Sequence, residues 1–354
     1  MPRRRSNASP RPPRDLPANE VIAFARRAEE LGFDEVWVVE DLGFRGGIAQ
    51  TAAVLASTTR LTVGVGILPA GSRNVAFAAM EIATLEELFP GRVVVGIGHG
   101  MPDWMRSAGA WPSSPLTLLR EYTIALTALL RGEPGPVAGR YVDVAGVRLD
   151  MVPGTPPPVV WGVRGPKSLA AAGHVADGLI LAEPSTPEYI RASVETAAFD
   201  TSRIGRRPPR LITYDIAVVA STDAAARELV RPMLGVISEP DWFPHIAPLP
   251  FAAEFVALRE HTGSAEAFAA ALPAEWIDTL TLAGTAERVR GGIAARHAAG
   301  ATSVVLTPIG SDRIGWLHSR ISQPSCRRNR SIALPARPKT HPWRTSSQRR
   351  LRPP

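Results

Sequence analysis

Short apolar runs rich in β-branched residues alternate along this chain with segments of helical spacing. Three such runs are Asp34–Asp41 (DEVWVVED), Thr62–Pro69 (TVGVGILP) and Arg92–Gly100 (RVVVGIGHG), and each ends in Asp, Gly, His or Pro. Continuous apolar strands between amphipathic helices indicate a parallel sheet that helices cover on both faces. Ligands bind to such folds beyond the carboxyl ends of the strands. The residues that end these runs are therefore the first candidates for function.

The size and order of the elements predict an α/β fold, a (β/α)8 TIM barrel, in which one strand is missing. Because the series begins with a helix, the missing strand is the first one. The segment that should supply it, residues 9–15 (SPRPPRD), contains three prolines and makes a poor central strand. Residues 133–157 break the alternation with Gly, Pro and short β-like pieces, which predicts an inserted hairpin, and residues 239–276 contain helical segments without a strand. The predicted strands are residues 36–39, 61–68, 92–97, 159–163, 179–182, 212–220 and 303–308.

The composition is that of a globular protein, with 45% hydrophobic and 21% charged residues. No apolar run reaches the roughly 18 residues of a membrane-spanning helix, and the Arg- and Pro-rich N-terminus lacks the apolar stretch of a secretory signal. Cys326 is the only cysteine, which excludes a disulfide framework and favours a reducing compartment. We therefore expect a cytoplasmic protein.

The net charge of +7 belongs to the two ends of the chain. Residues 1–14 carry five arginines and residues 321–354 carry eight arginines and one lysine, with no acidic residue in either, so residues 15–320 have a net charge of −7. Basic tails can bind nucleic acid, but no aromatic stripe accompanies the charge, and solvated tails are the favoured interpretation. The expected domains are a disordered basic tail over residues 1–15, a barrel domain over 16–318 and a second disordered basic tail over 319–354.

Two glycine-rich segments coincide with predicted strands or follow them. Residues 96–100 (GIGHG) lack the G-x-G-x-x-G spacing of a dinucleotide site, so their glycines either let the backbone approach a flat ligand or form a tight turn. Residues 62–74 (TVGVGILPAGSRN) hold two glycines inside a strand, which marks a bulge or a close backbone approach. Residues 64–67 therefore either contact the ring of a ligand or pack beneath a helix.

Residues 162–168 (GVRGPKS) predict a strand end, a turn and a helix start with Pro at the first helical position. The free N–H groups of the helix start, together with Arg164, Lys167 and the Ser168 hydroxyl, would make a phosphate site. The segment is not a Walker A loop, because the G-x-x-x-x-G-K spacing is absent. An ordinary helix start with solvent-facing charges explains it equally well.

Acidic and imidazole side chains also stand at the predicted strand ends. Glu40 and Asp41 follow the strand over residues 36–39, and an acid there can act as a base, anchor a substrate or cap the next loop, which is the commonest role. His99 can donate a proton near neutral pH, although a histidine in a glycine turn is more often only a hydrogen-bonding residue. The histidines show no metal-ligand spacing, and no motif of a nucleophilic enzyme occurs.

In this order, the segments resemble the bacterial luciferase-like monooxygenase superfamily. Its deazaflavin-dependent members, such as the methylenetetrahydromethanopterin reductases, are the more similar ones. The resemblance covers nearly all of residues 15–310. The matching segments are residues 28–41 (AEELGFDEVWVVED), 63–74 (VGVGILPAGSRN), 83–100 (ATLEELFPGRVVVGIGHG), 118–133 (LLREYTIALTALLRGE), 162–183 (GVRGPKSLAAAGHVADGLILAE) and 283–310 (AGTAERV…HAAGATSVVLTPIG).

The resemblance implies a (β/α)8 barrel with an insertion that binds FMN or coenzyme F-420 at its C-terminal mouth. It places a bulge with a non-prolyl cis peptide near Val65-Gly66, behind the cofactor ring. Trp104 and Trp111 are candidates for lining the mouth, although tryptophans in such a loop are as often packing residues. The other implied contacts are Gly98, His99 and Gly100 for the ring, and Gly162, Arg164, Gly165, Lys167 and Ser168 for the phosphate.

Three features depart from the family pattern. Leu42 stands where many deazaflavin enzymes have a histidine near the hydride-transfer centre, so that acid–base role has no counterpart here. Asp41 is instead a candidate for a polar contact with substrate or cofactor. Val75 replaces a common proline, and neither the first strand nor the last covering helix has a matching sequence.

The favoured function is an oxidoreductase that transfers hydride between coenzyme F-420 and a small organic substrate, with Asp41 and His99 as candidate catalytic residues. The alternative enzyme is an FMN-dependent monooxygenase that uses molecular oxygen and receives reduced flavin from a partner reductase. A non-catalytic or degraded barrel is the alternative of another class. The resemblance further implies a homodimer, with no membrane partner expected.

Overall fold

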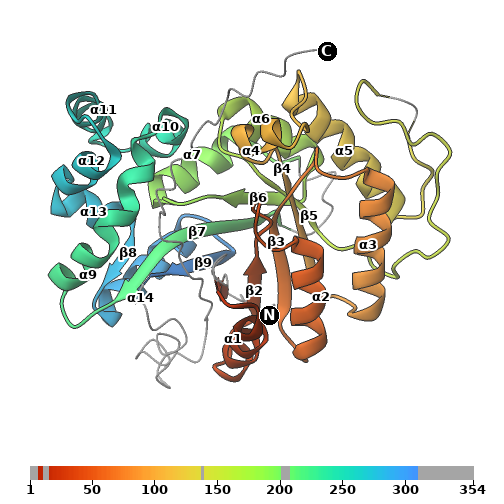
Figure 1. Ribbon diagram of the computed structural model, residues 1–354, viewed down its shortest axis with the longest axis horizontal. Coiled ribbons are helices and arrows are strands. Elements are labelled where there is room, and N and C mark those ends of the chain that lie inside the picture. The colour runs from red at the N-terminus through yellow and green to blue at the C-terminus, as the bar shows by residue number, and fades with distance from the viewer. Residues whose placement is uncertain (1–6, 11–15, 137–138, 201–207, 310–354) are drawn as a thin grey trace, which may run out of the picture.

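The computed structural model describes residues 7–10, 16–136, 139–200 and 208–309, which form a parallel sheet curled into a barrel with helices around it (Figure 1). The predicted (β/α)8 barrel is confirmed. A short additional strand, β8 (Leu282–Gly284), pairs with the last residues of β7. The barrel wall consists of β1 (Asn7–Pro10), β2 (Glu35–Val38), β3 (Thr62–Pro69), β4 (Val93–Gly98), β5 (Val159–Gly162), β6 (Gly178–Leu181), β7 (Arg210–Val219) and β9 (Ser303–Pro308).

The first strand of the barrel is present, and the prediction that it is missing is wrong. β1 runs parallel to β9, with Asn7 opposite Ser303 and Pro10 opposite Leu306, and it lies beside β2. It begins ahead of the proline-rich segment in which the strand was sought, and it ends at Pro10, before the other two prolines of that segment. β1 lies within the predicted tail over residues 1–15. The rest of that tail, and the tail over 319–354, fall outside the described residues.

Helices cover the outer face of the sheet, and a continuous hydrophobic core lies between the two layers. Side-chain caps fix the starts of several helices. The Asn74 side chain accepts a hydrogen bond from the Ala76 N–H at 2.8 Å, and the Thr186 hydroxyl accepts one from a backbone N–H in the first turn of the helix that follows it. Among the described residues, no helix is long and apolar enough to cross a membrane. The covering helices are α1 (Ala18–Glu30), α2 (Gly47–Ser57), α3 (Val75–Leu88), α4 (Pro102–Ser107), α5 (Pro115–Leu130), α6 (Pro166–Val175), α7 (Pro187–Ala197) and α14 (Ala286–Ala298).

Side chains fill the interior of the barrel. Trp37 and Tyr214 meet edge to face, with ring centroids 6.2 Å apart, and a Cβ atom at Gly64 would overlap the Trp37 indole. At the amino end, the buried Glu35 carboxylate pairs with Arg210 and accepts a hydrogen bond from Trp37 Nε1 at 3.0 Å. A packed interior leaves the C-terminal mouth as the place for a ligand. The interior residues are Trp37, Val39, Val94, Val160, Ile180, Ile212, Tyr214 and Val305.

The segment between α5 and β5 contains no β-strand in the part that the structure describes, so the predicted hairpin is not formed. The segment does fold back on itself, because the Gly135 N–H donates to the Val147 carbonyl at 2.8 Å. The carboxylate of Glu121 on α5 accepts hydrogen bonds from the N–H groups of Arg140, Tyr141 and Val142, at 2.9, 2.7 and 3.2 Å. These N–H groups bind a side chain instead of a neighbouring strand, which explains why no ladder forms.

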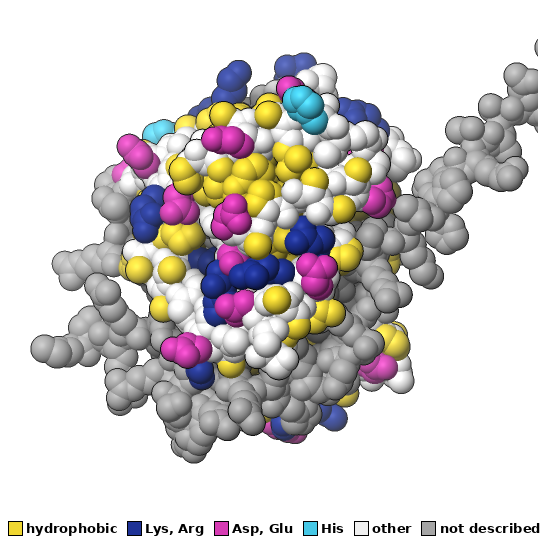
Figure 2. Space-filling view, turned by 90° about the vertical axis from the view of Figure 1, so that its left-hand side faces the viewer, with side chains coloured by type: hydrophobic (Ala, Val, Ile, Leu, Met, Phe, Trp, Pro, Cys, Tyr) yellow, Lys and Arg dark blue, Asp and Glu magenta, His cyan; other side chains and the backbone are white. Residues whose placement is uncertain are grey.

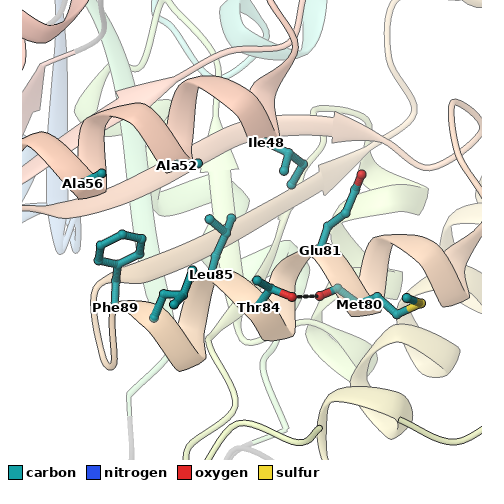
Figure 3. A pocket seen from close by; sticks show the side chains of 9 residues that line it. Ile48, Ala52, Ala56, Met80, Glu81, Thr84, Leu85 and Phe89 are labelled. Atoms are coloured by element: carbon teal, nitrogen blue, oxygen red, sulfur yellow. Dashed lines mark hydrogen bonds between the residues drawn. The ribbon is translucent and has the colours of Figure 1, made fainter. Parts of the chain in front are cut away.

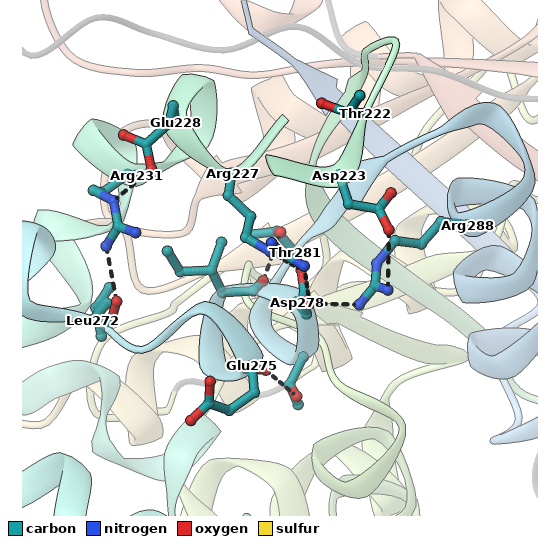
Figure 4. A network of polar contacts seen from close by, with 12 residues as sticks. Thr222, Asp223, Arg227, Glu228, Arg231, Leu272, Glu275, Asp278, Thr281 and Arg288 are labelled. Carbon is teal, nitrogen blue, oxygen red and sulfur yellow. Dashed lines mark hydrogen bonds and ion pairs between the residues drawn. The ribbon is translucent and has the colours of Figure 1, made fainter. Parts of the chain in front are cut away.

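The chain between β7 and β9 builds a second hydrophobic cluster, in which Phe255 and Phe268 meet edge to face at 5.1 Å. A polar network ties the outside of this insertion together: Asp278 pairs with Arg227 at 2.8 Å and with Arg288 at 2.9 Å (Figure 4). Charged side chains gather at the centre of this face (Figure 2). The helical segments predicted for residues 239–276 are present as η2 (Pro240–Trp242), α10 (Phe243–Ile246), α11 (Ala252–His261), α12 (Ala265–Ala271) and α13 (Ala274–Leu280). They follow α9 (Asp223–Val230) and η1 (Arg231–Ser238).

Candidate active site at the C-terminal mouth of the barrel

A bulge interrupts β3 at the mouth of the barrel. The register between β3 and β4 shifts between Val65 and Leu68, and the peptide bond between Gly66 and Ile67 is cis. The sequence placed the bulge and a non-prolyl cis peptide near Val65-Gly66, so the bulge is where we expected it and the cis bond is one residue later.

Ile67 occupies the space above the glycines of the neighbouring strands. A Cβ atom at Gly98 would lie 3.1 Å from Ile67 Cδ1, and one at Gly162 would overlap Ile67 Cγ2. At Gly66 a Cβ atom would overlap the Tyr214 hydroxyl. These glycines therefore make room for side chains of the barrel, a role that the sequence did not predict, since its alternatives to ligand contact were a tight turn and packing beneath a helix. The half-buried Ile67 forms the apolar top of the packed interior.

The structure brings together His99, just after β4, and Ser168, in the first turn of α6. His99 Nε2 lies 3.3 Å from Ser168 Oγ, within hydrogen-bonding distance. Burial lowers the pKa of His99, and the nearby Pro115 carbonyl partly opposes this shift. The imidazole is therefore neutral at pH 7 and can exchange a hydrogen bond without carrying charge. Gly100 follows with a φ of 73°, a left-handed conformation that suits glycine.

Arg164 has a desolvated guanidinium at the start of α6. Within the described residues, its Nη2 reaches only the sulfur of Met101, at 4.0 Å, and its buried Nη1 has no hydrogen-bond partner. Burial lowers the pKa of Arg164. Its Cζ atom lies 4.3 Å from the centre of the Trp242 ring. Gly165 precedes the helix with open space at its Cβ position, and the side chain of Lys167 is exposed.

The acids at the end of β2 have separate surroundings. Glu40 accepts a hydrogen bond from the Gly47 N–H at 2.8 Å and pairs with Arg73 at 2.8 Å, so it caps α2 and ties β2 to the loop after β3. Asp41 is half-exposed, and its carbonyl oxygen accepts from the Phe44 N–H at 3.0 Å. The sequence did not predict the part that Arg73 plays in this pair.

The positions of the two tryptophans that were candidates for lining the mouth do not distinguish ligand contact from packing. Trp104 on α4 is half-buried, and Trp111 lies under the guanidinium of Arg106, with 5.4 Å between the guanidinium carbon and the ring centre. Within the described residues, no group of three or more His, Cys, Asp or Glu side chains is arranged to hold a metal ion.

Three residues that lie near Arg164 were not predicted from the sequence. Trp242 Nε1 donates to the Glu183 carbonyl at 3.0 Å, and His245 Nδ1 donates to the Pro184 carbonyl at 3.1 Å. Tyr189 stacks on His245, with ring centroids 4.3 Å apart. Trp242 and His245 belong to the insertion between β7 and β9, where no local motif marks them as part of a site.

Comparison with known proteins identifies the family. The sequence profile described as luciferase-like monooxygenase matches residues 3–303, which is most of the chain. The chain therefore belongs to the luciferase-like monooxygenase family, as its motifs predicted.

Several curated relatives are enzymes that are named for their substrates or cofactor. The chain is 28% identical over 204 residues to the 5,10-methylenetetrahydromethanopterin reductase of Methanolobus tindarius, a match that covers 58% of this chain and 61% of that protein. An enzyme of the same name from Archaeoglobus fulgidus is 26% identical over 311 residues, with coverages of 84% and 92%. The F420-dependent glucose-6-phosphate dehydrogenase of Microbacterium testaceum is 31% identical over 201 residues, with coverages of 53% and 60%. The chain thus spans about three fifths of two of these relatives.

Solved structures confirm the fold. The coenzyme F420-dependent tetrahydromethanopterin reductase of Methanopyrus kandleri superposes with a TM-score of 0.74 at 22% identity, covering 89% of this chain and 96% of that one. The oxygenating constituent of 3,6-diketocamphane monooxygenase from Pseudomonas putida, in complex with FMN, gives 0.62 at 17% identity, with coverages of 84% and 91%. Both cofactors that the sequence suggested therefore occur among proteins of this fold.

Proposed function

We propose that this chain is an oxidoreductase that transfers hydride between coenzyme F-420 and a small organic substrate at the C-terminal mouth of the barrel. The observation that carries the proposal is the Arg164 guanidinium, which is desolvated and has a buried N–H group that finds no partner in the part of the chain that the structure describes. It lies at the start of α6, where free backbone N–H groups also attract anions. Relatives named for F420-dependent reactions support this choice of cofactor.

The residues of the mouth fit a ring that carries a phosphate. Ile67 offers an apolar surface for the ring, next to Gly98 and His99. Arg164, with the start of α6 and the Ser168 hydroxyl, would hold the phosphate. When bound, the cofactor supplies the hydride chemistry, and the protein orients the two reactants and excludes water.

His99 and Asp41 are the proposed polar contacts of the reacting groups. The neutral imidazole of His99 would exchange a hydrogen bond with the polar edge of the ring, while Ser168 fixes its orientation from 3.3 Å. Asp41, at the rim beyond β2, would contact substrate or cofactor. Leu42 stands beside it and cannot transfer a proton, so Asp41 and His99 are the ionisable groups that we assign to the site.

Equilibrium titrations of the purified protein with coenzyme F-420 and, separately, with FMN test the proposal. Burial of the ring changes its absorbance or quenches its emission. Saturable binding of coenzyme F-420 with weaker binding of FMN is the expected result. A folded sample that binds neither cofactor would contradict the proposal and favour a non-catalytic barrel.

The second candidate function is an FMN-dependent monooxygenase that uses molecular oxygen. The similarity to an FMN-containing oxygenating constituent favours it, and a partner reductase would then supply reduced flavin. Preferential binding of FMN, followed by oxygen consumption when reduced FMN is added, would establish this alternative over the first.

We also infer a homodimer that forms through α2 and α3. A groove of about 530 Å³ lies between these helices, and most of its lining is apolar (Figure 3). α2 has no charged residue along its length, and Phe77, Met80 and Leu88 on α3 are 65%, 53% and 64% exposed. Because the groove and the protruding side chains share one face, a two-fold related copy can fill the groove with its own side chains.

The mass of the protein in solution tests the homodimer. Light scattering is expected to give twice the chain mass for the wild type and the single-chain mass for Met80→Glu. The matched control is Leu229→Glu, an exposed leucine on α9 at the other end of the molecule (Figure 1). A monomeric wild type at tens of micromolar would contradict this inference.

The chain's single cysteine, Cys326, suits a reducing compartment. We therefore propose a cytoplasmic enzyme that acts on a small molecule.

A further inference from the structure

We propose that Trp242 and His245 are positioning residues that hold the Arg164 guanidinium as an unpaired cation for the phosphate group of the ligand. Both belong to the insertion between β7 and β9, far from Arg164 in the sequence. This inference rests on the proposed function for the identity of the ligand, but inorganic phosphate tests it without any cofactor.

The contacts of Arg164 leave its charge without a counter-ion. Among the described residues, no carboxylate forms an ion pair with Arg164. The charges of Glu183 and Asp241 affect the guanidinium only electrostatically, from beyond ion-pair distance. The face of an aromatic ring stabilises a cation without neutralising it and without using its N–H groups. Trp242 therefore stabilises the guanidinium and leaves Nη1 able to donate to an anion. Within the described part of the chain, the other arginines with a buried nitrogen that lacks a hydrogen bond each form an ion pair, whereas Arg164 does not, which points to an anion as its missing partner.

Trp242 is fixed in place over Arg164 by its own hydrogen bond. Its Nε1 donates to the Glu183 carbonyl at 3.0 Å, in the loop that follows β6. The indole thus connects the insertion to the barrel mouth and keeps its ring 4.3 Å from the guanidinium carbon. Loss of the ring would let the guanidinium turn toward solvent or toward Glu183 and Asp241, and either movement would weaken phosphate binding.

His245 anchors the same segment from the inside. It is fully buried, donates from Nδ1 to the Pro184 carbonyl at 3.1 Å and stacks on Tyr189. The Tyr189 hydroxyl in turn donates to the Arg164 carbonyl at 3.5 Å. His245 therefore supports the backbone of Arg164 through Tyr189, while Trp242 supports its side chain.

The competing interpretation is that these rings only pack the insertion against the barrel. FMN and riboflavin separate the two interpretations, because they share one ring and differ by the phosphate. A packing defect weakens both ligands alike, whereas misplacement of Arg164 weakens only the ligand that carries the phosphate. The same comparison can be made between coenzyme F-420 and its phosphate-free chromophore.

The experiment measures the affinities of both ligands for the wild type, Trp242→Leu, Trp242→Phe and Arg164→Met. Trp242→Leu is expected to weaken FMN binding roughly tenfold and riboflavin binding less than twofold. Trp242→Phe keeps an aromatic face and should retain most of the FMN affinity, and Arg164→Met should show the largest loss for FMN alone. Equal weakening of FMN and riboflavin by Trp242→Leu, or no weakening of either, would overturn the proposal.

Calorimetric titration with inorganic phosphate separates this proposal from the proposed function. Phosphate is expected to bind the wild type and to bind Trp242→Leu several-fold more weakly. If neither cofactor binds but phosphate shows this difference, the proposed function fails and the role of Trp242 stands. If phosphate binds the two proteins equally, or does not bind the wild type, the role of Trp242 is refuted.

Discussion

Ile67, Tyr214 and Trp37 occupy the space that a side chain would need at several glycines of the mouth and the interior. A glycine beside a ligand site is easily assigned to the ligand, yet Gly66 and Gly162 face protein atoms here. The apolar surface available to a ring is therefore the exposed part of Ile67, and the glycines act by letting Ile67 settle between β4 and β5. Gly165 differs, because nothing lies within 4 Å of its Cβ position.

The pH dependence of stability should report on His245. Burial, followed by the charge of Arg164, lowers the pKa of His245 to about 3, whereas an unfolded histidine titrates near 6.5. Between these values the unfolded chain binds a proton that the folded chain does not, so the free energy of unfolding falls as pH drops below about 6.5. The loss from His245 should approach about 1.4 kcal/mol per pH unit.

Urea unfolding of the wild type and His245→Phe between pH 7 and pH 5 checks this expectation. The variant should lose less stability over that range, whatever its stability at pH 7. His174→Gln is the control, because that side chain is exposed on α6. Identical slopes for the wild type and His245→Phe would contradict the proposed neutral, buried state.

At the scale of elements, a buried ion pair fastens α14 to β7. Arg296 Nε donates to Asp215 Oδ1 at 2.7 Å, and Thr213 Oγ1 donates to the other carboxylate oxygen at 3.2 Å. Both charged side chains are almost completely buried. A buried pair adds little over apolar packing, but removal of one partner leaves the other charge in a dry environment.

Asp215→Asn should therefore destabilise the protein by about 3 kcal/mol or more. The double variant Asp215→Leu with Arg296→Met should recover much of this loss, because it removes both charges. Asp278→Asn, in the more exposed network of Figure 4, is the matched control and should cost about 1 kcal/mol or less. Chemical denaturation measures all three values, and equal losses for Asp215→Asn and Asp278→Asn would refute the distinction.

The elements also show what the sequence can and cannot predict. Strands with continuous apolar runs, such as β3 and β4, were evident because burial on both faces requires such runs. β1 and β8 have four and three residues and no apolar run that periodicity could detect, and their existence depends on pairing with β9 and β7. In residues 133–157 the β-like sequence was misleading, because the Glu121 carboxylate takes the N–H groups that a partner strand would need.

The candidate site likewise contains residues that the sequence predicts and residues that it does not. His99, Arg164 and Ser168 follow predicted strands, and the rule that parallel strands end at one edge places them together. Trp242 and His245 reach the site only through the packing of the insertion between β7 and β9. Such contacts are tertiary, so single-sequence reasoning had no signal for them.

Across the whole molecule, the packed interior separates the polar side chains of the two barrel ends, and those at the carboxyl end include a cation that forms no ion pair among the described residues. Glu35 and Arg210 form an ion pair at the amino end, while His99, Ser168 and Arg164 lie at the carboxyl end. We therefore propose that a phosphate-bearing cofactor binds at the start of α6.

The titration of Gly165→Asp with coenzyme F-420 tests this claim most directly. Gly165 has a φ of −82° and open space, so an aspartate fits there without strain and stabilises the start of α6. Its charge should nevertheless weaken binding of coenzyme F-420 by about tenfold or more. Gly154→Asp, at another open position, should bind like the wild type. Equal affinities for Gly165→Asp and the wild type would contradict the account, because the cofactor would then bind elsewhere.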